Sequence, residues 1–97
     1  MARYELSIAA DRDFEGIFNF GIDRFGLAQA LSYQDGLKQR FANLAADPER
    51  YPAVVHIREG YRRSVFGAHA IYYRIEPQRV FIVRILGRQD PGIALSE

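Results

Sequence analysis

The sequence predicts a single α+β domain, in which an N-terminal strand and a helical hairpin pack on an antiparallel sheet in the order β-α-α-β-β-β. Apolar residues recur at every second position near the N-terminus, at every third or fourth position up to about residue 46, and at every second position again after residue 60. The 97 residues, of which 48% are hydrophobic and 26% charged, have the composition of one globular domain spanning residues 1–97.

The first strand and the first helix are predicted by a change of period. The strand is predicted from apolar residues that alternate with polar ones: Tyr4, Leu6 and Ile8. Apolar or small residues then follow at helical spacing: Phe14, Ile17, Phe18, Gly21, Ile22 and Phe25. Either Ser7 or Asp11 is suited to cap this helix, because both side chains accept hydrogen bonds from exposed backbone amides. Gly26 is expected to end it, since glycine tolerates positive φ.

A second helix is predicted from about Leu27 to Ala46. Its apolar stripe consists of Leu27, Leu31, Leu37, Phe41 and Leu44. Because only Gly26 separates it from the first helix, the two are expected to fold back as an antiparallel hairpin. Asp47-Pro48 ends it, since proline disfavours helical geometry in the preceding residue.

Three strands are predicted after a connecting segment at residues 48–59. They are Tyr61–Phe66, Ala68–Glu76 and Arg79–Leu86, and their short links favour an antiparallel meander. Alternation places Phe81, Val83 and Ile85 on one face of the last strand, and Val80, Ile82 and Leu86 on the other. By the same alternation, one of Tyr72 and Tyr73 is expected in the core and the other at the surface. The segment from Gly87 onward is predicted to be polar and loose.

Several kinds of chemistry find no support in the sequence. The absence of cysteine excludes disulfides and thiolate zinc sites, and two histidines give no metal-ligand spacing. No serine lies in a nucleophile elbow, and the glycines form no phosphate-binding loop. We therefore expect no catalytic residues, cofactor or metal. The lack of a signal-like or membrane-length apolar run leads us to expect a cytoplasmic protein with no membrane partner.

Positive charge is concentrated in the second half of the chain. Residues 53–97 hold seven arginines and four acidic residues, whereas residues 1–52 hold six basic and eight acidic residues. This excess favours an anionic partner, either a nucleic acid or an acidic protein segment, although solvated arginines on strand faces explain it equally well. Five arginines fall on or just beyond the predicted sheet: Arg62, Arg63, Arg74, Arg84 and Arg88.

Arg84, His69 and the aromatic side of the first helix each have both a structural and a functional interpretation. Arg84 lies on a semi-apolar face and needs an anionic or carbonyl partner, either internal, such as Glu5 or Asp90, or external. His69 is expected to be buried and hydrogen-bonded rather than catalytic. The aromatic side of the first helix, including Phe14 and Phe18, is suited to a binding groove, with core packing as the simpler alternative.

The stretch Gly60–Asp90 resembles the C-terminal half of toxins of the ParE/RelE superfamily, and of the ParE branch in particular. The motifs that carry this resemblance are Gly60-Tyr61-Arg62-Arg63, Gly67-Ala68-His69, Tyr73-Arg74 and Val83-Arg84-Ile85-Leu86. Near the N-terminus, Tyr4-Glu5-Leu6-Ser7, Asp13-Phe14-Glu15-Gly16-Ile17 and Arg24-Phe25-Gly26 also look like the family's first strand and helix. The resemblance covers nearly the whole chain.

The resemblance implies the toxin half of a type II toxin–antitoxin pair that inhibits DNA gyrase and is neutralised by a ParD-like antitoxin. The residues expected to bind antitoxin or target are Arg62, Arg63, Arg74, Arg84, Arg88, Phe14, Phe18, Val80 and Ile82. We expect no sequence-specific binding of nucleic acid.

Two alternatives remain open: a RelE-like ribosome-dependent mRNA endonuclease, and a toxin-derived binding module without toxicity. An enzyme is disfavoured, because no tyrosine or lysine follows Tyr73 and arginine is a poor general base. The Gly87-Arg88-Gln89-Asp90 segment departs from the ParE pattern, which commonly has a histidine directly after the Ile-Leu pair.

Overall fold

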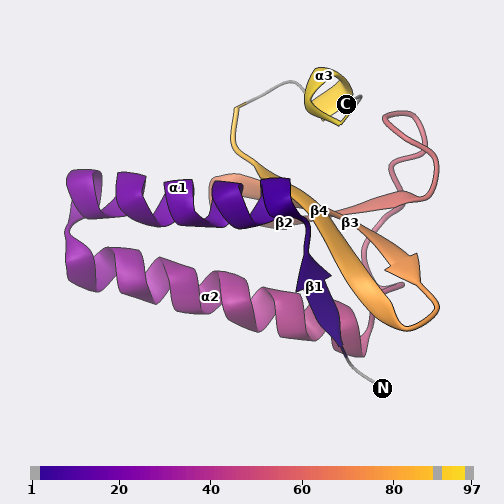
Figure 1. The fold of residues 1–97 in the computed structure, drawn as a ribbon, viewed down its shortest axis with the longest axis horizontal. Helices are drawn as coiled ribbons and strands as arrows, with labels where there is room; N and C mark the ends of the chain where they lie inside the picture. Colours follow the sequence, from indigo (N-terminus) through magenta and orange to yellow (C-terminus); the bar gives the residue numbers. More distant parts are fainter. Residues whose placement is uncertain (1–2, 89–90, 96–97) are drawn as a thin grey trace.

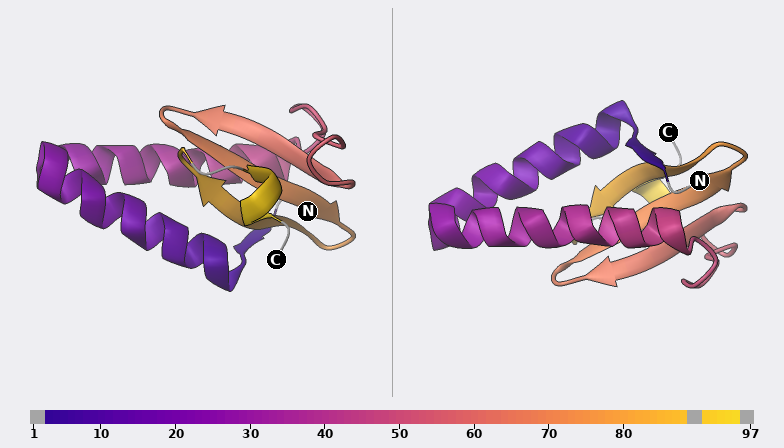
Figure 2. Two further views of the ribbon diagram at one scale, coloured as in Figure 1. Left: turned by 90° about the horizontal axis from the view of Figure 1, so that it is seen from above. Right: turned by 90° about the horizontal axis from the view of Figure 1, so that it is seen from below.

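The computed structural model describes residues 3–88 and 91–95. The elements run in the order β1 (Tyr4–Leu6), α1 (Ile8–Phe25), α2 (Leu27–Ala46), β2 (Tyr61–Phe66), β3 (His69–Glu76), β4 (Arg79–Leu86) and α3 (Pro91–Ala94). Figure 1 shows the two long helices folded back on one another and running past the end of the sheet. Figure 2 shows α2 and α3 on opposite faces of that sheet. The predicted fold class and the predicted order of elements are confirmed.

Helix α1 begins earlier than alternation predicted. Ser7 is its N-cap, and the Ser7 hydroxyl accepts a hydrogen bond from the backbone amide of Ala10. This cap leaves Ile8 as the first helical residue, 76% exposed, so assigning Ile8 to the strand was wrong. Of the two candidate caps, Ser7 is the one used, because Asp11 already lies in the first turn.

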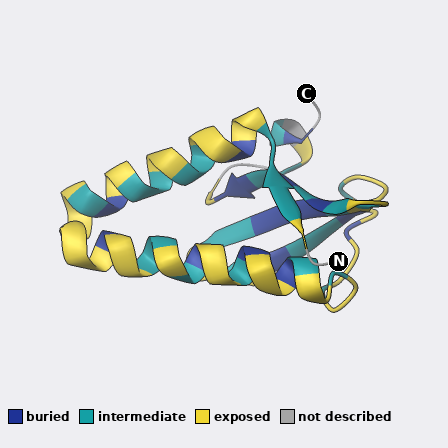
Figure 3. Ribbon diagram, turned by 60° about the horizontal axis from the view of Figure 1, so that its bottom comes forward, coloured by how far each residue is buried: buried dark blue, intermediate teal, exposed yellow. Residues whose placement is uncertain are grey.

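The turn between the helices is a single glycine. Gly26 has φ 90° and ψ 164°, a backbone conformation that is essentially restricted to glycine. Close to this turn, Gly21 of α1 packs on Ala30 of α2. A methyl group on Gly21 would lie only 3.2 Å from the Ala30 Cβ. Figure 3 shows buried residues on the inward sides of both helices and mainly exposed residues near the turn. Within the described residues, no helix is long and apolar enough to cross a membrane.

The sheet has the strand order β1-β4-β3-β2. Strands β2, β3 and β4 form the predicted antiparallel meander, and β1 joins the outer side of β4 in parallel, which makes the sheet mixed. Strand β3 begins at His69 rather than Ala68, because Phe66 pairs with His69 and leaves Gly67 and Ala68 as a two-residue turn. The helices join the ends of β1 and β2, so they must cross one face of the sheet.

A bulge in β4 changes which side chains share a face. Tyr72 pairs with Arg84 and Tyr73 pairs with Ile82, so Val83 is an extra residue on β4. After this bulge Ile85 joins Val80 and Ile82 in the core beneath the helices. The predicted grouping of Phe81, Val83 and Ile85 was therefore wrong, because strict alternation holds only up to the bulge.

Both faces of the sheet are covered. The helix side holds the main core, in which Tyr73, Phe41 and Ile82 are almost fully buried. On the opposite face Tyr72 packs with Leu95 from the end of the chain, and both are only 3% exposed. The prediction that one tyrosine of the pair lies at the surface was therefore wrong. The expectation of a loose C-terminal segment was also wrong for residues 91–95, because Pro91–Ala94 form α3 and Leu95, which follows it, packs in this second cluster.

The turn glycine gives a direct test of the hairpin. Gly26→Ala should lower the free energy of unfolding by about 1–3 kcal/mol, because alanine is strained at this φ and ψ. Gly16→Ala is the matched control within α1, since a Cβ there meets no atom within 4 Å. The control should instead raise stability by about 0.5–1 kcal/mol through helix propensity. Urea titration of both variants measures this difference, and equal stability of the two would contradict the assigned turn.

Candidate functional site

Helix α1 is fixed to the sheet by two polar side chains along the outer side of β4. The Ser7 amide donates to the Ile82 carbonyl at 2.9 Å, and the Ser7 hydroxyl donates to the Val83 carbonyl at 2.7 Å. Two turns along α1, the Asp13 carboxylate accepts from the Ile85 amide at 2.9 Å and from Arg84 at 2.7 and 3.0 Å. These contacts continue the edge pairing of β4 beyond the end of the three-residue strand β1.

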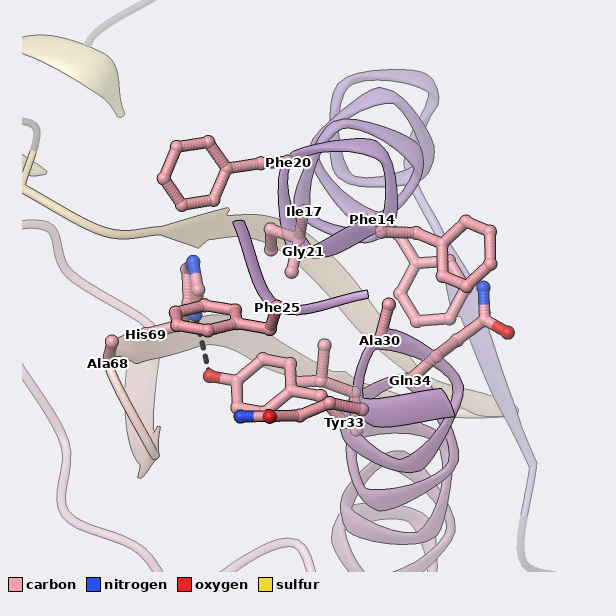
Figure 4. Close-up of a pocket in the computed structure, with 13 residues that line it drawn as sticks. Phe14, Ile17, Phe20, Gly21, Phe25, Ala30, Tyr33, Gln34, Ala68 and His69 are labelled. Carbon is pink, nitrogen blue, oxygen red and sulfur yellow. Dashed lines mark hydrogen bonds between the residues drawn. The ribbon is translucent and has the colours of Figure 1, made fainter. Parts of the chain in front are cut away.

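The hairpin of α1 and α2 extends past the sheet and forms one wall of an apolar trough. The trough has a volume of about 330 Å³. It lies between the two helices and the turn that leads into β3 (Figure 4). Its lining residues are Phe14, Ile17, Phe18, Phe20, Gly21, Phe25, Gln29, Ala30, Tyr33, Gln34, Leu37, Ala68 and His69. Phe14 and Phe18 both line this trough, and Phe14 also packs against the core and Phe41, as the core-packing alternative expected.

Two phenylalanines at the mouth of the trough remain largely exposed. Phe20 is 59% exposed and Phe25 is 58% exposed, although each is a large apolar side chain. Both line the trough near the end of the hairpin. Contiguous exposed apolar surface of this kind is typical of a site that another molecule covers.

The main polar feature of the trough is a hydrogen-bonded Tyr33–His69 pair. The Tyr33 hydroxyl lies 2.6 Å from His69 Nδ1 and 3.0 Å from the backbone carbonyl of Phe66. Burial lowers the pKa of His69 below its usual value, an effect that the Asp13 carboxylate partly offsets. Burial also raises the pKa of Tyr33, so near neutral pH the pair is an uncharged phenol and an uncharged imidazole. The prediction of a hydrogen-bonded His69 is confirmed, and the ring is half-buried.

The predicted arginines do not gather at one place. Arg62 donates to the Tyr51 and Glu49 carbonyls, at 2.6 and 3.3 Å. Arg74 pairs with Glu76 at 2.7 Å. Arg79, which was not among the candidates, bridges Glu76 and Glu5, and hydrogen bonds from arginines lower the pKa of both carboxyl groups. Much of the positive charge of the sheet is therefore balanced within the molecule.

Arg84 has an internal partner, as expected, and the partner that the structure describes is Asp13. It pairs with Asp13 at 2.7 Å rather than with Glu5, and Asp90 lies outside the described residues. Of the remaining candidates, Arg63 is half-buried beside Tyr72 in the sheet register, and Arg88 is exposed just after β4. Gln89 and Asp90, the rest of the segment that departs from the family pattern, are also outside the described residues.

Val80 and Ile82 are not on an accessible surface. They are 3% and 0% exposed in the core beneath the helices, so placing them on a partner-binding face is corrected. Their side chains point toward α1 and α2 because the first half of β4, before the bulge, forms the floor of that core. Within the described residues, no three histidine, aspartate or glutamate side chains are grouped so that they could hold a metal ion.

Sequence reasoning missed Phe20 and Tyr33 as members of the site. Phe20 lies outside the apolar stripe of α1. A phenylalanine on the side of a helix that faces solvent could have indicated a binding surface. Tyr33 carries no signal of its own, because its role depends on meeting His69, 36 positions later.

Comparisons with known proteins agree on one family. Residues 4–91 match the family described as the ParE toxin of the type II toxin–antitoxin system parDE. The chain is similar to toxin ParE1 of Mycobacterium tuberculosis, with 36% identity over 86 residues and 88% of each chain covered. It is also similar to toxin ParE1 of Caulobacter vibrioides, with 34% identity and 89% and 88% coverage.

Two solved structures share the fold. A chromosomal ParDE system from P. aeruginosa superposes with a TM-score of 0.79 at 15% identity, covering 92% of this chain and 98% of the other. The toxin–antitoxin complex RelBE2 from Mycobacterium tuberculosis gives a TM-score of 0.59 at 22% identity, covering 90% and 98%.

The anchoring role of Asp13 is open to a stability test. Asp13→Ala should lower the free energy of unfolding by about 2–4 kcal/mol, because it leaves the part-buried Arg84 and the Ile85 amide without this carboxylate. Glu15→Ala, an exposed acidic position on the same helix, should change stability by no more than about 0.5 kcal/mol. Denaturant unfolding of both variants makes the comparison. Losses of equal size would mean that the Asp13 contacts are not what fixes α1.

Proposed function

This chain belongs to the ParE toxin family of type II toxin–antitoxin systems, and we propose that it inhibits DNA gyrase, and thereby DNA replication, until a ParD-like antitoxin covers it. The action proposed is binding without catalysis. It takes place in the cytoplasm, where the bacterial chromosome and its gyrase lie.

The exposed apolar trough is the observation that carries the antitoxin part of the proposal. An amphipathic helix can bury its apolar face in such a groove, and a disordered segment can fold as it binds. Phe20 and Phe25 offer large rings at the mouth of the trough. The structural similarity to proteins described as a ParDE system and a RelBE2 complex adds support, because both are toxin–antitoxin systems.

Inhibition by binding is supported by how the polar side chains are held. Cleavage of RNA needs a group that accepts the 2′-hydroxyl proton and another that protonates the leaving oxygen. The guanidinium groups of Arg62, Arg74 and Arg84 cannot accept protons near neutral pH, and each is already bonded within the molecule. Arg63 and Arg88 are the candidates best placed for contact with a target.

Two assays separate the proposed target from the ribosomal alternative. Purified gyrase with relaxed plasmid should lose supercoiling activity when the toxin is added and regain it when antitoxin is added. Unchanged supercoiling, with no trapped cleavage complex, would remove gyrase as the target. Primer extension on cellular messages after toxin induction should show no site-specific cuts, and such cuts would favour a ribosome-dependent nuclease instead.

The trough itself is tested by placing a charge at its mouth. Phe25→Asp should weaken binding of a cognate ParD-like antitoxin by about thirty-fold or more, because a buried aromatic contact contributes about 2 kcal/mol or more. Leu27→Asp is the matched control: Leu27 is similarly exposed at 57% and close to the turn, but does not line the trough. Calorimetric titration of both variants gives the comparison. Equal weakening in the two would place the antitoxin elsewhere.

A further inference from the structure

The contacts of the Tyr33 hydroxyl favour one position for the proton on the neutral His69 ring. The Tyr33 hydroxyl has one proton and lies 3.0 Å from the Phe66 carbonyl oxygen and 2.6 Å from His69 Nδ1, and its oxygen also accepts a hydrogen bond from the Ala68 backbone. A carbonyl oxygen can only accept, so the phenol proton must point to Phe66 if both contacts are hydrogen bonds. Nδ1 must then carry the imidazole proton and donate it to the Tyr33 oxygen. In that tautomer of the neutral ring, Nε2 carries no proton and is a hydrogen-bond acceptor.

This acceptor faces the trough. Figure 4 shows one His69 nitrogen on the bond to Tyr33 and the other directed away from it, toward the region between Phe20 and Phe25. Within residues 3–88 and 91–95, no hydrogen bond is made by Nε2. The remaining polar groups of the lining are the amides of Gln29 and Gln34, which can either donate or accept and therefore do not select for a donor.

We propose that the trough selects an aromatic side chain that carries a single N–H or O–H donor, and that His69 Nε2, oriented by Tyr33, receives that donor. The ligand is thus a tryptophan or tyrosine on the segment of the antitoxin that enters the trough. That the side chain comes from an antitoxin rests on the proposed function. That it is aromatic and carries a hydrogen-bond donor rests on the geometry of the trough.

The lining explains both halves of that selectivity. Aromatic and small residues leave space for a flat ring and offer stacking contacts with Phe20, Phe25 and Tyr33. An aliphatic side chain would fill part of the same space but leave Nε2 desolvated and without a hydrogen bond, which costs binding free energy. Within this arrangement His69 is the specificity residue, and Tyr33 is a positioning residue that acts through it.

The proposal is tested with small probes on the full chain freed from its antitoxin. Indole carries one N–H donor, and benzothiophene has nearly the same shape without it. We expect His69→Asn, which keeps a side-chain N–H for Tyr33 but removes Nε2, to reduce the ratio of indole affinity to benzothiophene affinity about three- to ten-fold. His56→Asn, at an exposed loop histidine, should leave the ratio unchanged. Binding is followed by amide shifts of Phe20 and Ala68.

A second measurement needs no variant. The imidazole ¹⁵N shifts of the wild-type protein should show a protonated Nδ1 and an unprotonated Nε2, and indole but not benzothiophene should move the Nε2 signal. A protonated Nε2, or an affinity ratio that is the same in wild type and His69→Asn, would overturn the proposal. Indole binding through His69 by a chain that leaves gyrase active would support this site while removing the proposed target, so the two proposals can fail separately.

Discussion

The outer side of β4 is the constraint on which the rest of the structure depends. Strand β1 pairs with only the first part of β4, so the backbone beyond it needs other partners. Ser7 and Asp13 supply them from the start of α1, and Asp13 also holds Arg84. Because both ends of this contact are fixed, the direction of α1 is set as it leaves the sheet. The single-residue turn at Gly26 then sets the direction of α2.

That geometry leaves more apolar surface than positive charge available for contact with a partner. The helices run past the sheet and leave aromatic rings around an open trough, whereas most of the arginines on the strands are engaged by carboxylates or carbonyls. Arg62, Arg74 and Arg84 thus contribute to the shape of the sheet and its loops. In the proposed function, a partner is recognised mainly by how it fills the trough and by what it offers to His69, while Arg63 and Arg88 remain the candidates for contact with an anionic group.

Most of the fold could be predicted from the sequence, because the helices have clear apolar stripes and the strands are separated by turn residues. The bulge at Val83 could not be predicted. Residues 80–86 are apolar on both faces apart from Arg84, so no alternation of polar and apolar residues shows which side chains share a face. The burial of Tyr72 could not be predicted either, because both faces of the sheet are covered. The segment that covers Tyr72 comes from the C-terminal residues, which look polar in sequence. Helical spacing placed Phe14 and Phe18 on one side of α1, where both line the trough, whereas the Tyr33–His69 contact depends on tertiary structure.

The far side of the sheet is shielded as thoroughly as the β4 side. Ala53 bridges Arg62 on the open side of β2, the Arg63 amide donates to the Pro52 carbonyl, and Arg40 occupies the Val65 carbonyl. Little unpaired strand backbone therefore remains on which a second copy could dock and extend the sheet. Extension of the sheet by pairing with a second copy is therefore disfavoured at the β2 edge.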